Sequence, residues 1–422
     1  MIRYQIFLLL GALLHTPRPM PAQSAESRRW IEDLDALVRE LPKRHVAPET
    51  ERPLEAFRAD VERVKARLPS MSREETLVEL VRLAASFGDS HTELPLSQAA
   101  LGFHRFPLGL YFFGTDLRVV ATTPGHATLL GLRLVAVGRH PIADVLARVR
   151  PLLGDDFGNP HEFLHSAPAF VTIPEVLVAL GFAARPERIQ YVFAQDDGQR
   201  VTAEFALLSF PAAASALTER VLDAATGPLW VRHRERWHLA ERVDSSDLLY
   251  VRLTRSQNQP QQESLARFAQ RVGAAARDAD VRRVVIDIRQ NTGGNFHTTE
   301  PLVQAVCDAA RDGALARVYV ILGRHTYSAA IVFAAQLKHG CDAQFVGEVP
   351  RAVPNRQADM ETFRLPHSRL EVTYSARIRR PFPELGDATE IPLDLPAPLT
   401  WESYRAGRDP ALEAILRRRG GE

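Results

Sequence analysis

The stretch "VRRVVIDIRQNTGGNF", residues 281–296, predicts a buried β-strand that ends in a paired-glycine turn before a helix. The same alternation recurs on both sides of it. Strand-like runs lie at 247–253 and 316–323, and helical runs lie at 265–278, 298–312 and 328–340. Continuous β-rich runs separated by helices indicate a largely parallel sheet whose faces are covered. The sequence therefore predicts an α/β core over residues 240–422.

Two regions of different character precede this core. Residues 26–97 repeat apolar residues at three-to-four spacing, which is typical of amphipathic helices, and Ser72 with Glu75 forms a candidate capping box. Residues 98–225 change to short strands and turns, and "RIQYVFAQDDGQRVTAEFALL" (188–208) predicts a hairpin that turns at "DDGQ". We expect an N-terminal helical region followed by a β-rich middle module.

The composition sets broad limits on function. The chain has 422 residues, of which 45% are hydrophobic and 24% charged, and its net charge is +1. These values are ordinary for a globular protein. The balance of charge gives no general reason to expect nucleic acid or an anionic membrane as a partner. Nothing in the sequence indicates an oligomeric state.

Residues 1–25 predict a cleaved signal peptide. Arg3 precedes an apolar run at 6–14, and a Pro-rich segment with small residues follows. The apolar run is too short to span a bilayer comfortably, and no later run approaches spanning length. We therefore expect an exported protein, periplasmic or secreted, with no stable membrane span. Export permits a disulfide between the two cysteines, Cys307 and Cys341, although a buried free pair fits the sequence equally well.

Ser328 lies in "GRHTYSAAIVFA" (323–334), where a strand-like run passes into an apolar helix. Serine is a preferred helix cap, so an ordinary cap is the first interpretation. A serine nucleophile would instead need a base and fixed donors for the developing oxyanion. The N–H of Ala329, in the first turn of the helix, is one candidate donor. Gly293 and Gly294 are another, because paired glycines let the backbone come close to a neighbouring group; a plain strand-to-helix turn is the alternative.

The choice of base is narrowed by the scarcity of lysine. The chain has three lysines, Lys43, Lys65 and Lys338. Lys338 lies ten residues along the helix that Ser328 opens, which puts it about 15 Å away. Because a serine–lysine pair would need Lys43 or Lys65 to fold far across the molecule, histidine is the expected base.

Two histidines are considered for this role. His325 is close to the serine in sequence but lies in the loop that leads into the helix. His91, in "SFGDSHTEL" (86–94), follows a helix end and has Asp89 and Ser90 beside it to orient an imidazole. A histidine on a surface loop is the alternative interpretation of His91.

Together these motifs resemble the C-terminal-processing (tail-specific) and tricorn-core family of serine peptidases. The stretches that carry the resemblance are "SFGDSHTEL", "VVIDIRQNTGGN", "GRHTYSAAIVFAAQLKHGCDAQFVGE" and "PNRQADMETFRLPHSRLEVTYSA". The resemblance implies a crotonase-like (ClpP-like) catalytic core. "GLRLVAVGRHPIADVL" is similar to the PDZ-like module often found in the family, which would place a PDZ-like unit in the middle region.

The resemblance also implies roles for single residues. The nucleophile position is Ser328, and the oxyanion hole falls on Gly293 or Gly294 together with Ala329. Lysine-type members carry Gly-Lys-Gly soon after a "GE" motif, whereas this sequence has "GEVPRAVPN". Histidine-type members carry a Ser-His pair, and "SH" at 90–91 matches it. The chain is therefore expected to be of the histidine type.

A glutamate completes the site in that family, and its place in this sequence stays open. Glu348 fits the "GE" motif, while Glu384 and Glu390 fit the expected separation from the serine. The implied mechanism requires no metal or organic cofactor. The implied substrate is a peptide or a protein.

Two other functions compete with this hypothesis. "HEFLH" (161–165) matches the H-E-x-x-H pattern, in which His161 and His165 would bind zinc beside Glu162 as base. Pro168 follows closely and the extended zinc-binding continuation is absent, which counts against zinc. A non-catalytic binding protein on the same fold is the third possibility, because a fold does not fix an activity. An exported serine endopeptidase is the favoured hypothesis.

Overall fold

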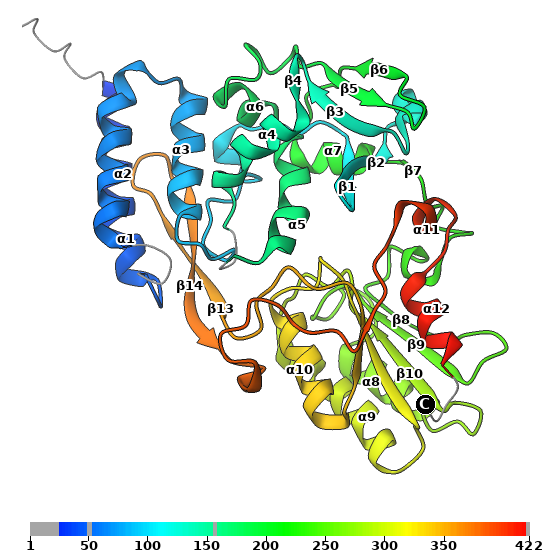
Figure 1. The fold of residues 1–422 in the computed structure, drawn as a ribbon. Helices are drawn as coiled ribbons and strands as arrows, with labels where there is room; N and C mark the ends of the chain where they lie inside the picture. Colours follow the sequence, from blue (N-terminus) through cyan, green and yellow to red (C-terminus); the bar gives the residue numbers. More distant parts are fainter. Residues whose placement is uncertain (1–24, 49–52, 155–157, 419–422) are drawn as a thin grey trace, which may run out of the picture.

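The computed structural model describes residues 25–48, 53–154 and 158–418. The expected signal peptide, apart from its last residue, lies outside the described residues. Figure 1 shows a group of N-terminal helices, a middle unit and a C-terminal core arranged around a central region. That central region is where loops from all three parts meet.

The N-terminal part consists of α1 (Ala25–Arg44), α2 (Leu54–Arg67) and α3 (Arg73–Ala85). The predicted capping box is confirmed, because the Ser72 side chain accepts from the N–H of Glu75 and the Glu75 side chain accepts from the N–H of Ser72. The apolar sides of these helices form one buried cluster. The predictions of N-terminal helices and of the helix start at Ser72 are therefore confirmed.

A hairpin from late in the chain completes this cluster. Strands β13 (Gln357–Arg364) and β14 (Glu371–Arg379) pair antiparallel, and Leu370, Val372 and Tyr374 are buried with the N-terminal helices. Figure 1 shows the hairpin beside α1 and α3 rather than on the core sheet. The sequence places this segment within 240–422, yet its side chains pack with the first part of the chain.

The middle unit is a seven-stranded antiparallel sheet with helices packed against it. Its strands are β1 (Gly109–Phe113), β2 (Asp116–Thr122), β3 (Arg133–Val137), β4 (His140–Pro141), β5 (Tyr191–Ala194), β6 (Arg200–Ala203) and β7 (Glu219–Arg220). Its helices are α4 (Ile142–Val149), α5 (Pro160–Phe170), α6 (Pro174–Ala179) and α7 (Phe210–Ala216). The hairpin predicted around "DDGQ" is confirmed, since β5 and β6 pair across that turn.

The core sheet has the order β15-β12-β11-β10-β9-β8. Its strands are β8 (His238–Arg242), β9 (Leu248–Leu253), β10 (Arg283–Asp287), β11 (Arg317–Leu322), β12 (Gln344–Gly347) and β15 (Leu395–Pro396). All neighbours pair parallel except β8 and β9. The expectation of a largely parallel sheet is therefore confirmed.

Helices cover both faces of this sheet, as the unbroken apolar strands require. Helices α8 (Leu265–Ala275), α9 (Glu300–Arg311) and α10 (Ala329–Cys341) bury one face. The opposite face packs against α12 (Pro410–Arg417), which follows the short α11 (Trp401–Arg405). Alternate residues of each strand point to opposite faces, so both faces need apolar side chains.

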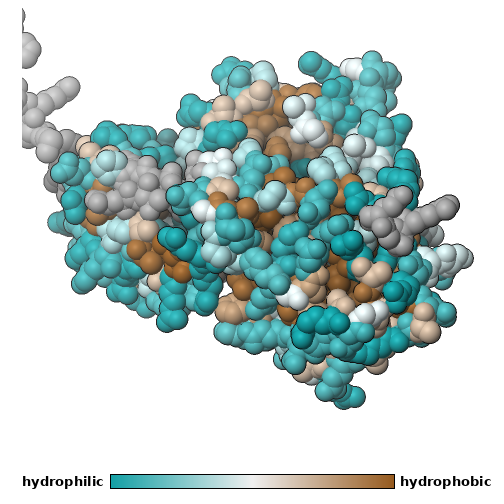
Figure 2. All heavy atoms as spheres, turned by 60° about the horizontal axis from the view of Figure 1, so that its bottom comes forward, coloured by the Kyte–Doolittle hydropathy of each residue, from teal (hydrophilic) through white to brown (hydrophobic). Residues whose placement is uncertain are grey.

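Several features of the surface and the covalent structure bear on the sequence predictions. Cys307 and Cys341 form a disulfide that joins α9 to the end of α10, which resolves the open question of their pairing. None of the described helices combines the length and apolar character needed to cross a bilayer. Figure 2 shows a face covered mostly by hydrophilic residues, with hydrophobic residues visible in patches between them.

Candidate active site

Ser328 is not an ordinary helix cap in this structure. It precedes α10 with φ of 56° and ψ of −125°, and its side chain makes no capping hydrogen bond. That backbone conformation is strained for any residue with a side chain and is found where the surrounding structure enforces it. Here the loop is fixed by the hydrogen bond from the Tyr327 N–H to the Asn291 carbonyl, 3.0 Å. The hydroxyl is therefore turned away from the helix end and is available to another group.

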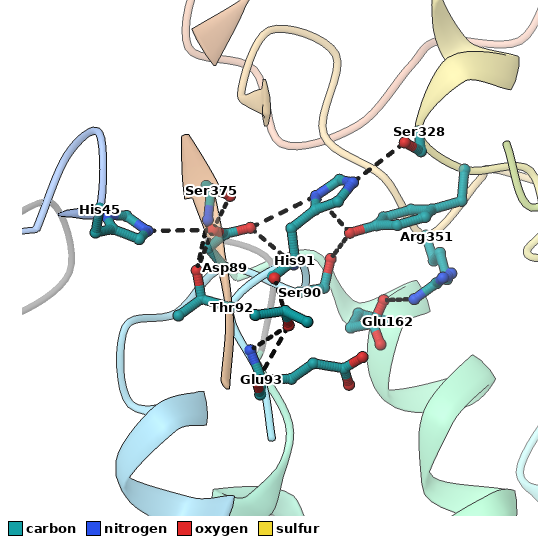
Figure 3. Close-up of polar contacts among 12 residues, drawn as sticks. His45, Asp89, Ser90, His91, Thr92, Glu93, Glu162, Ser328, Arg351 and Ser375 are labelled. Atoms are coloured by element: carbon teal, nitrogen blue, oxygen red, sulfur yellow. Dashed lines mark hydrogen bonds and ion pairs between the residues drawn. The ribbon is translucent and has the colours of Figure 1, made fainter. Parts of the chain in front are cut away.

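That group is His91. Its Nε2 lies 3.2 Å from the Ser328 Oγ, although the two residues are 237 positions apart in the chain. The imidazole is 4% exposed and belongs to the loop after α3. Figure 3 shows the ring lying between the serine on one side and the Asp89 network on the other. The structure thus brings together the two residues on which the serine-nucleophile hypothesis depends.

Strand β14 positions the His91 loop. The Thr373 N–H donates to the Glu93 carbonyl at 2.9 Å, and the Thr373 hydroxyl donates to the His91 carbonyl at 3.1 Å. The late hairpin thereby attaches to the first part of the chain and carries the His91 loop to the core. This is the structural reason why a loop so early in the sequence reaches Ser328.

Tyr327 is a site residue that the sequence did not reveal. Its hydroxyl lies 2.7 Å from the His91 Nδ1 and 2.5 Å from the Ser90 Oγ. Its ring stacks on the imidazole with centroids 4.5 Å apart. Ser90 therefore reaches the imidazole through the tyrosine. The only signal for Tyr327 in the sequence is its position next to Ser328, which by itself does not predict a contact with a distant histidine.

The hydrogen bonds of His91 determine which nitrogen can act as base. If Nε2 is to accept a proton from Ser328, then Nδ1 must carry the ring hydrogen. Nδ1 would donate to the Tyr327 oxygen, and the Tyr327 hydroxyl would donate to Ser90. The Asp89 carboxylate, 3.7 Å from Nδ1, favours the same tautomer because it attracts the proton.

Asp89 anchors the loop beneath this histidine. Its buried carboxylate accepts hydrogen bonds from the backbone N–H of His91 at 2.9 Å, from Thr92 at 2.7 Å and from Ser375, and it lies 3.2 Å from the His45 Nε2. Burial alone would raise the pKa of Asp89, but hydrogen bonds with His45 and His91 outweigh it and lower that pKa. Asp89 thus remains charged and orients the imidazole mainly through the loop backbone.

The paired glycines touch the nucleophile. A Cβ added to Gly293, whose φ is 104°, would lie 2.8 Å from the Ser328 Cβ and 3.2 Å from the Ala329 nitrogen. Only glycine allows this approach. The Gly293 N–H already donates to the Asn291 side chain at 2.9 Å, whereas within the described residues the N–H groups of Gly294 and Ala329 have no hydrogen-bond partner. Of the two glycines, Gly294 is therefore the one with a free donor.

The candidate glutamates lie elsewhere. Glu348 accepts from the Tyr111 hydroxyl at 3.2 Å and from the Leu399 N–H at 2.9 Å, and it lies 3.4 Å from Arg324. The other two glutamates pair with other histidines, since Glu384 lies 3.0 Å from His339 and Glu390 lies 3.5 Å from His161. No described contact joins any of the three to His91 or Ser328. Among the described contacts, the group closest to the His91 Nδ1 is the Tyr327 hydroxyl, at 2.7 Å.

The other residues that could act as the base, His325 and the lysines, make no described contact with Ser328. Burial, together with the charges of Arg351 and Arg324, lowers the pKa of His325 to about 4. The His325 ring packs against His165, with centroids 4.7 Å apart, rather than against Ser328. Lys65 pairs with Asp35 and Glu62, and Lys338 pairs with Asp394. Lys43 is exposed in the last turn of α1. These contacts leave His91 as the base that the geometry offers.

The zinc-type motif lies on α5 and gains no support from its surroundings. The Glu162 carboxylate, 3% exposed, accepts from Arg351 at 2.7 Å and from Ser166. His161 faces Glu390, while His165 packs on His325. In the part of the chain that the structure describes, no group of three or more His, Cys, Asp or Glu side chains is placed to hold a metal.

A cavity of about 730 Å³ opens in front of the serine. Ser328, His91 and Gly294 line it together with apolar side chains such as Leu152 and Phe296. Its size is in the range of small-molecule and peptide side-chain sites. The hydroxyl, the imidazole and a free backbone donor therefore all border one space that a substrate could enter.

Comparison with known proteins identifies the fold. No protein-family model matches the chain, and neither does any curated protein. Mature CPAF complexed with lactacystin superposes with a TM-score of 0.65 at 13% identity, covering 93% of this chain and 97% of that chain. The photosystem II D1 C-terminal processing protease matches with a TM-score of 0.42 at 16% identity, covering 94% and 98%. The tricorn protease matches with a TM-score of 0.41 at 10% identity, covering 93% and 36%.

The chain therefore has the overall fold of mature CPAF. The structures that match it also include the two kinds of peptidase whose family the sequence resembles. Their TM-scores, below 0.5, are too low to support an inference about this chain. At 13% identity the CPAF likeness shows the fold alone, so the activity has to be argued from the site.

Proposed function

We propose that this protein is a serine endopeptidase of the C-terminal-processing and tricorn-core family, with a histidine base. The observation that carries the proposal is the 3.2 Å contact between the Ser328 Oγ and the His91 Nε2. The strained backbone at Ser328 adds support, because strain of this kind is kept where a side chain must be presented at a site. The free N–H groups of Gly294 and Ala329 supply donors for an oxyanion.

The mechanism follows from these positions. Ser328 attacks the substrate carbonyl carbon as the His91 Nε2 takes its proton. The carbonyl oxygen becomes an oxyanion, which accepts hydrogen bonds from the N–H groups of Gly294 and Ala329. His91 then gives its proton to the leaving amine, so that the peptide bond breaks and an ester to Ser328 remains. A water molecule, deprotonated by His91, attacks this ester and releases the acid product and the free serine.

The finer assignments belong to the same proposal. We infer that the parallel sheet with α8, α9 and α10 is a crotonase-like core, and that the sheet of the middle unit is a PDZ-like module that binds the substrate chain. The strand–helix alternation and the antiparallel sheet support these assignments. We also propose export to the periplasm or the cell exterior. Its support is the charged and apolar pattern of residues 1–25 together with the disulfide between Cys307 and Cys341.

Labelling with a fluorophosphonate tests the proposal directly. We expect one phosphonyl group per chain, mapped by peptide analysis to Ser328, because the activated hydroxyl attacks phosphorus as it attacks a carbonyl. The label should form at the same rate with and without a metal chelator. A chelator-sensitive peptidase that resists the label would instead favour the "HEFLH" zinc hypothesis. No label and no cleavage of any peptide library would favour the non-catalytic binding protein.

Replacing Tyr327 by phenylalanine should slow catalysis through its effect on His91. We expect kcat to fall roughly ten- to a hundredfold, the value of one hydrogen bond to a group that becomes charged, with KM nearly unchanged. Tyr374→Phe is the matched control, since the Tyr374 hydroxyl bonds to Glu361 at 2.8 Å, outside the site. Wild-type kcat in the Tyr327→Phe variant would contradict the assigned role.

A further inference from the structure

A second cavity, of about 560 Å³, lies on the far side of the glycine turn from the serine. It opens where the strands of the core sheet end and the middle unit begins, and Thr292 borders both cavities. The proposed mechanism makes no use of this space. Its lining carries an excess of positive charge, because six arginines and a single glutamate, Glu348, surround it.

This excess of positive charge is local. The whole chain has 52 basic and 51 acidic residues, so a random selection of side chains would be nearly neutral. Two of the six arginines are matched by acids, because Arg289 pairs with Asp287 and Asp409, and Arg324 pairs with Glu348. The other four form no close ion pair with a carboxylate among the described residues, although the charge of Asp223 acts on Arg234. These four are Arg220, Arg234, Arg252 and Arg255.

Arg252 shows how this charge is accommodated. The residue is 2% exposed, and its terminal nitrogens donate only to backbone carbonyls. The acceptors are the carbonyls of Leu229, Trp230, Arg232, His233 and Arg236. A buried guanidinium is costly unless it is paired with an opposite charge. The dipoles of the backbone carbonyls offset the charge of Arg252 only in part. The wall of the cavity therefore keeps a positive potential.

The remaining arginines lie nearer the solvent. Arg234 donates to the carbonyls of Val231 and Leu222 at 3.1 and 3.3 Å. Burial and the neighbouring charge of Arg220 lower the pKa of Arg234, which shows that the two cations repel each other. Arg255 lies over the Trp237 ring at 5.1 Å. Within the described residues the guanidinium groups of Arg220 and Arg255 make no hydrogen bond, so both are free to bind a ligand.

We propose that this cavity binds a small organic anion that has an oxyanion head group on a flat apolar body. Arg220, Arg234 and Arg255 would hold the head group, because guanidinium groups bind carboxylate, sulfonate and phosphate oxygens in pairs. Arg252, whose terminal nitrogens are engaged by backbone carbonyls, would contribute through its charge alone. The aromatic rings of Trp230, Trp237, Tyr111 and Tyr404 also line the cavity and would contact the body. The volume suits a ligand of this size. Binding relieves the repulsion between the arginines and does not depend on Ser328.

Calorimetric titration of the full chain with phenyl phosphate tests the proposal. We expect one site per chain, with an affinity that falls as salt is added. Arg220→Ala and Arg255→Ala should each weaken binding by roughly tenfold, the value of a charge-assisted hydrogen bond. Arg234→Ala should do the same if it folds. Arg267→Ala removes an exposed arginine of α8 outside the cavity and should leave the affinity unchanged.

Several outcomes would overturn the proposal. These are no binding of phenyl phosphate, unchanged binding in the Arg220→Ala and Arg255→Ala variants, or an equal loss in Arg267→Ala. Benzyl alcohol, which lacks the charge, should not bind, and equal binding would refute an anion site. Inorganic phosphate should bind more weakly than phenyl phosphate. Equal affinities of the two would refute the proposal that the aromatic rings contact a flat apolar body of the ligand. Ser328→Ala should bind normally, so failure of the peptidase proposal would leave this result unaffected.

Discussion

Replacing Ser328 by alanine is expected to abolish peptide hydrolysis and leave the fold intact. The substitution removes the one hydroxyl that, within the described residues, contacts the His91 Nε2. Loss of a catalytic serine in a serine–histidine site lowers kcat by roughly 10⁴- to 10⁶-fold, down to the residual rate from the oxyanion donors and binding. The measurement is kcat for peptide cleavage, with fluorophosphonate labelling as a second readout. Both should fall to background.

Stability should hardly change in this variant. The Ser328 side chain makes no capping hydrogen bond, and alanine meets the same backbone strain at φ of 56° as serine does. Ser264→Ala is the matched control. The Ser264 hydroxyl caps α8 by accepting from the Arg267 N–H, so its loss should cost about 1 kcal/mol of stability and leave kcat unchanged. A Ser328→Ala variant that still cleaves peptides at the wild-type rate would refute the proposed function.

Replacing His91 by alanine is expected to be nearly as damaging. Without the imidazole, no described group is placed to take the proton of Ser328 or to return it to the leaving amine. We expect kcat to fall by roughly 10⁴- to 10⁶-fold, with KM less affected because the cavity walls remain. Added imidazole should restore part of the rate, since the substitution leaves a space beside the Ser328 hydroxyl. Rescue by a small base distinguishes loss of a base from loss of structure.

A parallel His325→Ala variant separates the two histidines that the sequence left in competition. The His325 ring lies against His165 and Tyr111 at the second cavity. Its loss should therefore leave kcat within a few-fold of wild type if the variant folds, which thermal unfolding would check. Full activity of His91→Ala together with an inactive, folded His325→Ala would show that the base had been assigned to the wrong residue.

A good part of the fold could be predicted from the sequence because the relevant signals are local. The apolar strand at 281–288 is followed by a turn with paired glycines. Strands that alternate with helices along the chain predict a parallel sheet. The capping box at Ser72 and the "DDGQ" turn depend on residues within a few positions of each other. All three predictions are confirmed by the structure. The position of Ser328 between β11 and α10 follows from the same local alternation.

The candidate site could be predicted only in outline. The stretches around Ser328 and His91 were found, but the sequence could not show whether they meet, because their contact joins residues 237 positions apart. Tyr327 was missed, since the direction of a side chain in a loop depends on the bonds that hold the loop. The choice among glutamates failed for a similar reason. Glu348 fits a motif, yet its carboxylate bonds to Tyr111 and Leu399 on the other side of the turn.

By itself, then, the sequence determined the order of strands and helices, the glycine turn and the two polar stretches, because backbone preferences and apolar periodicity act over short distances. Only the tertiary structure decided that β14 carries the His91 loop to Ser328, which glycine N–H stays free, and that Cys307 pairs with Cys341. It also decided that four unmatched arginines border one cavity. These outcomes depend on how separate layers pack, and packing is settled by contacts between residues far apart in the chain.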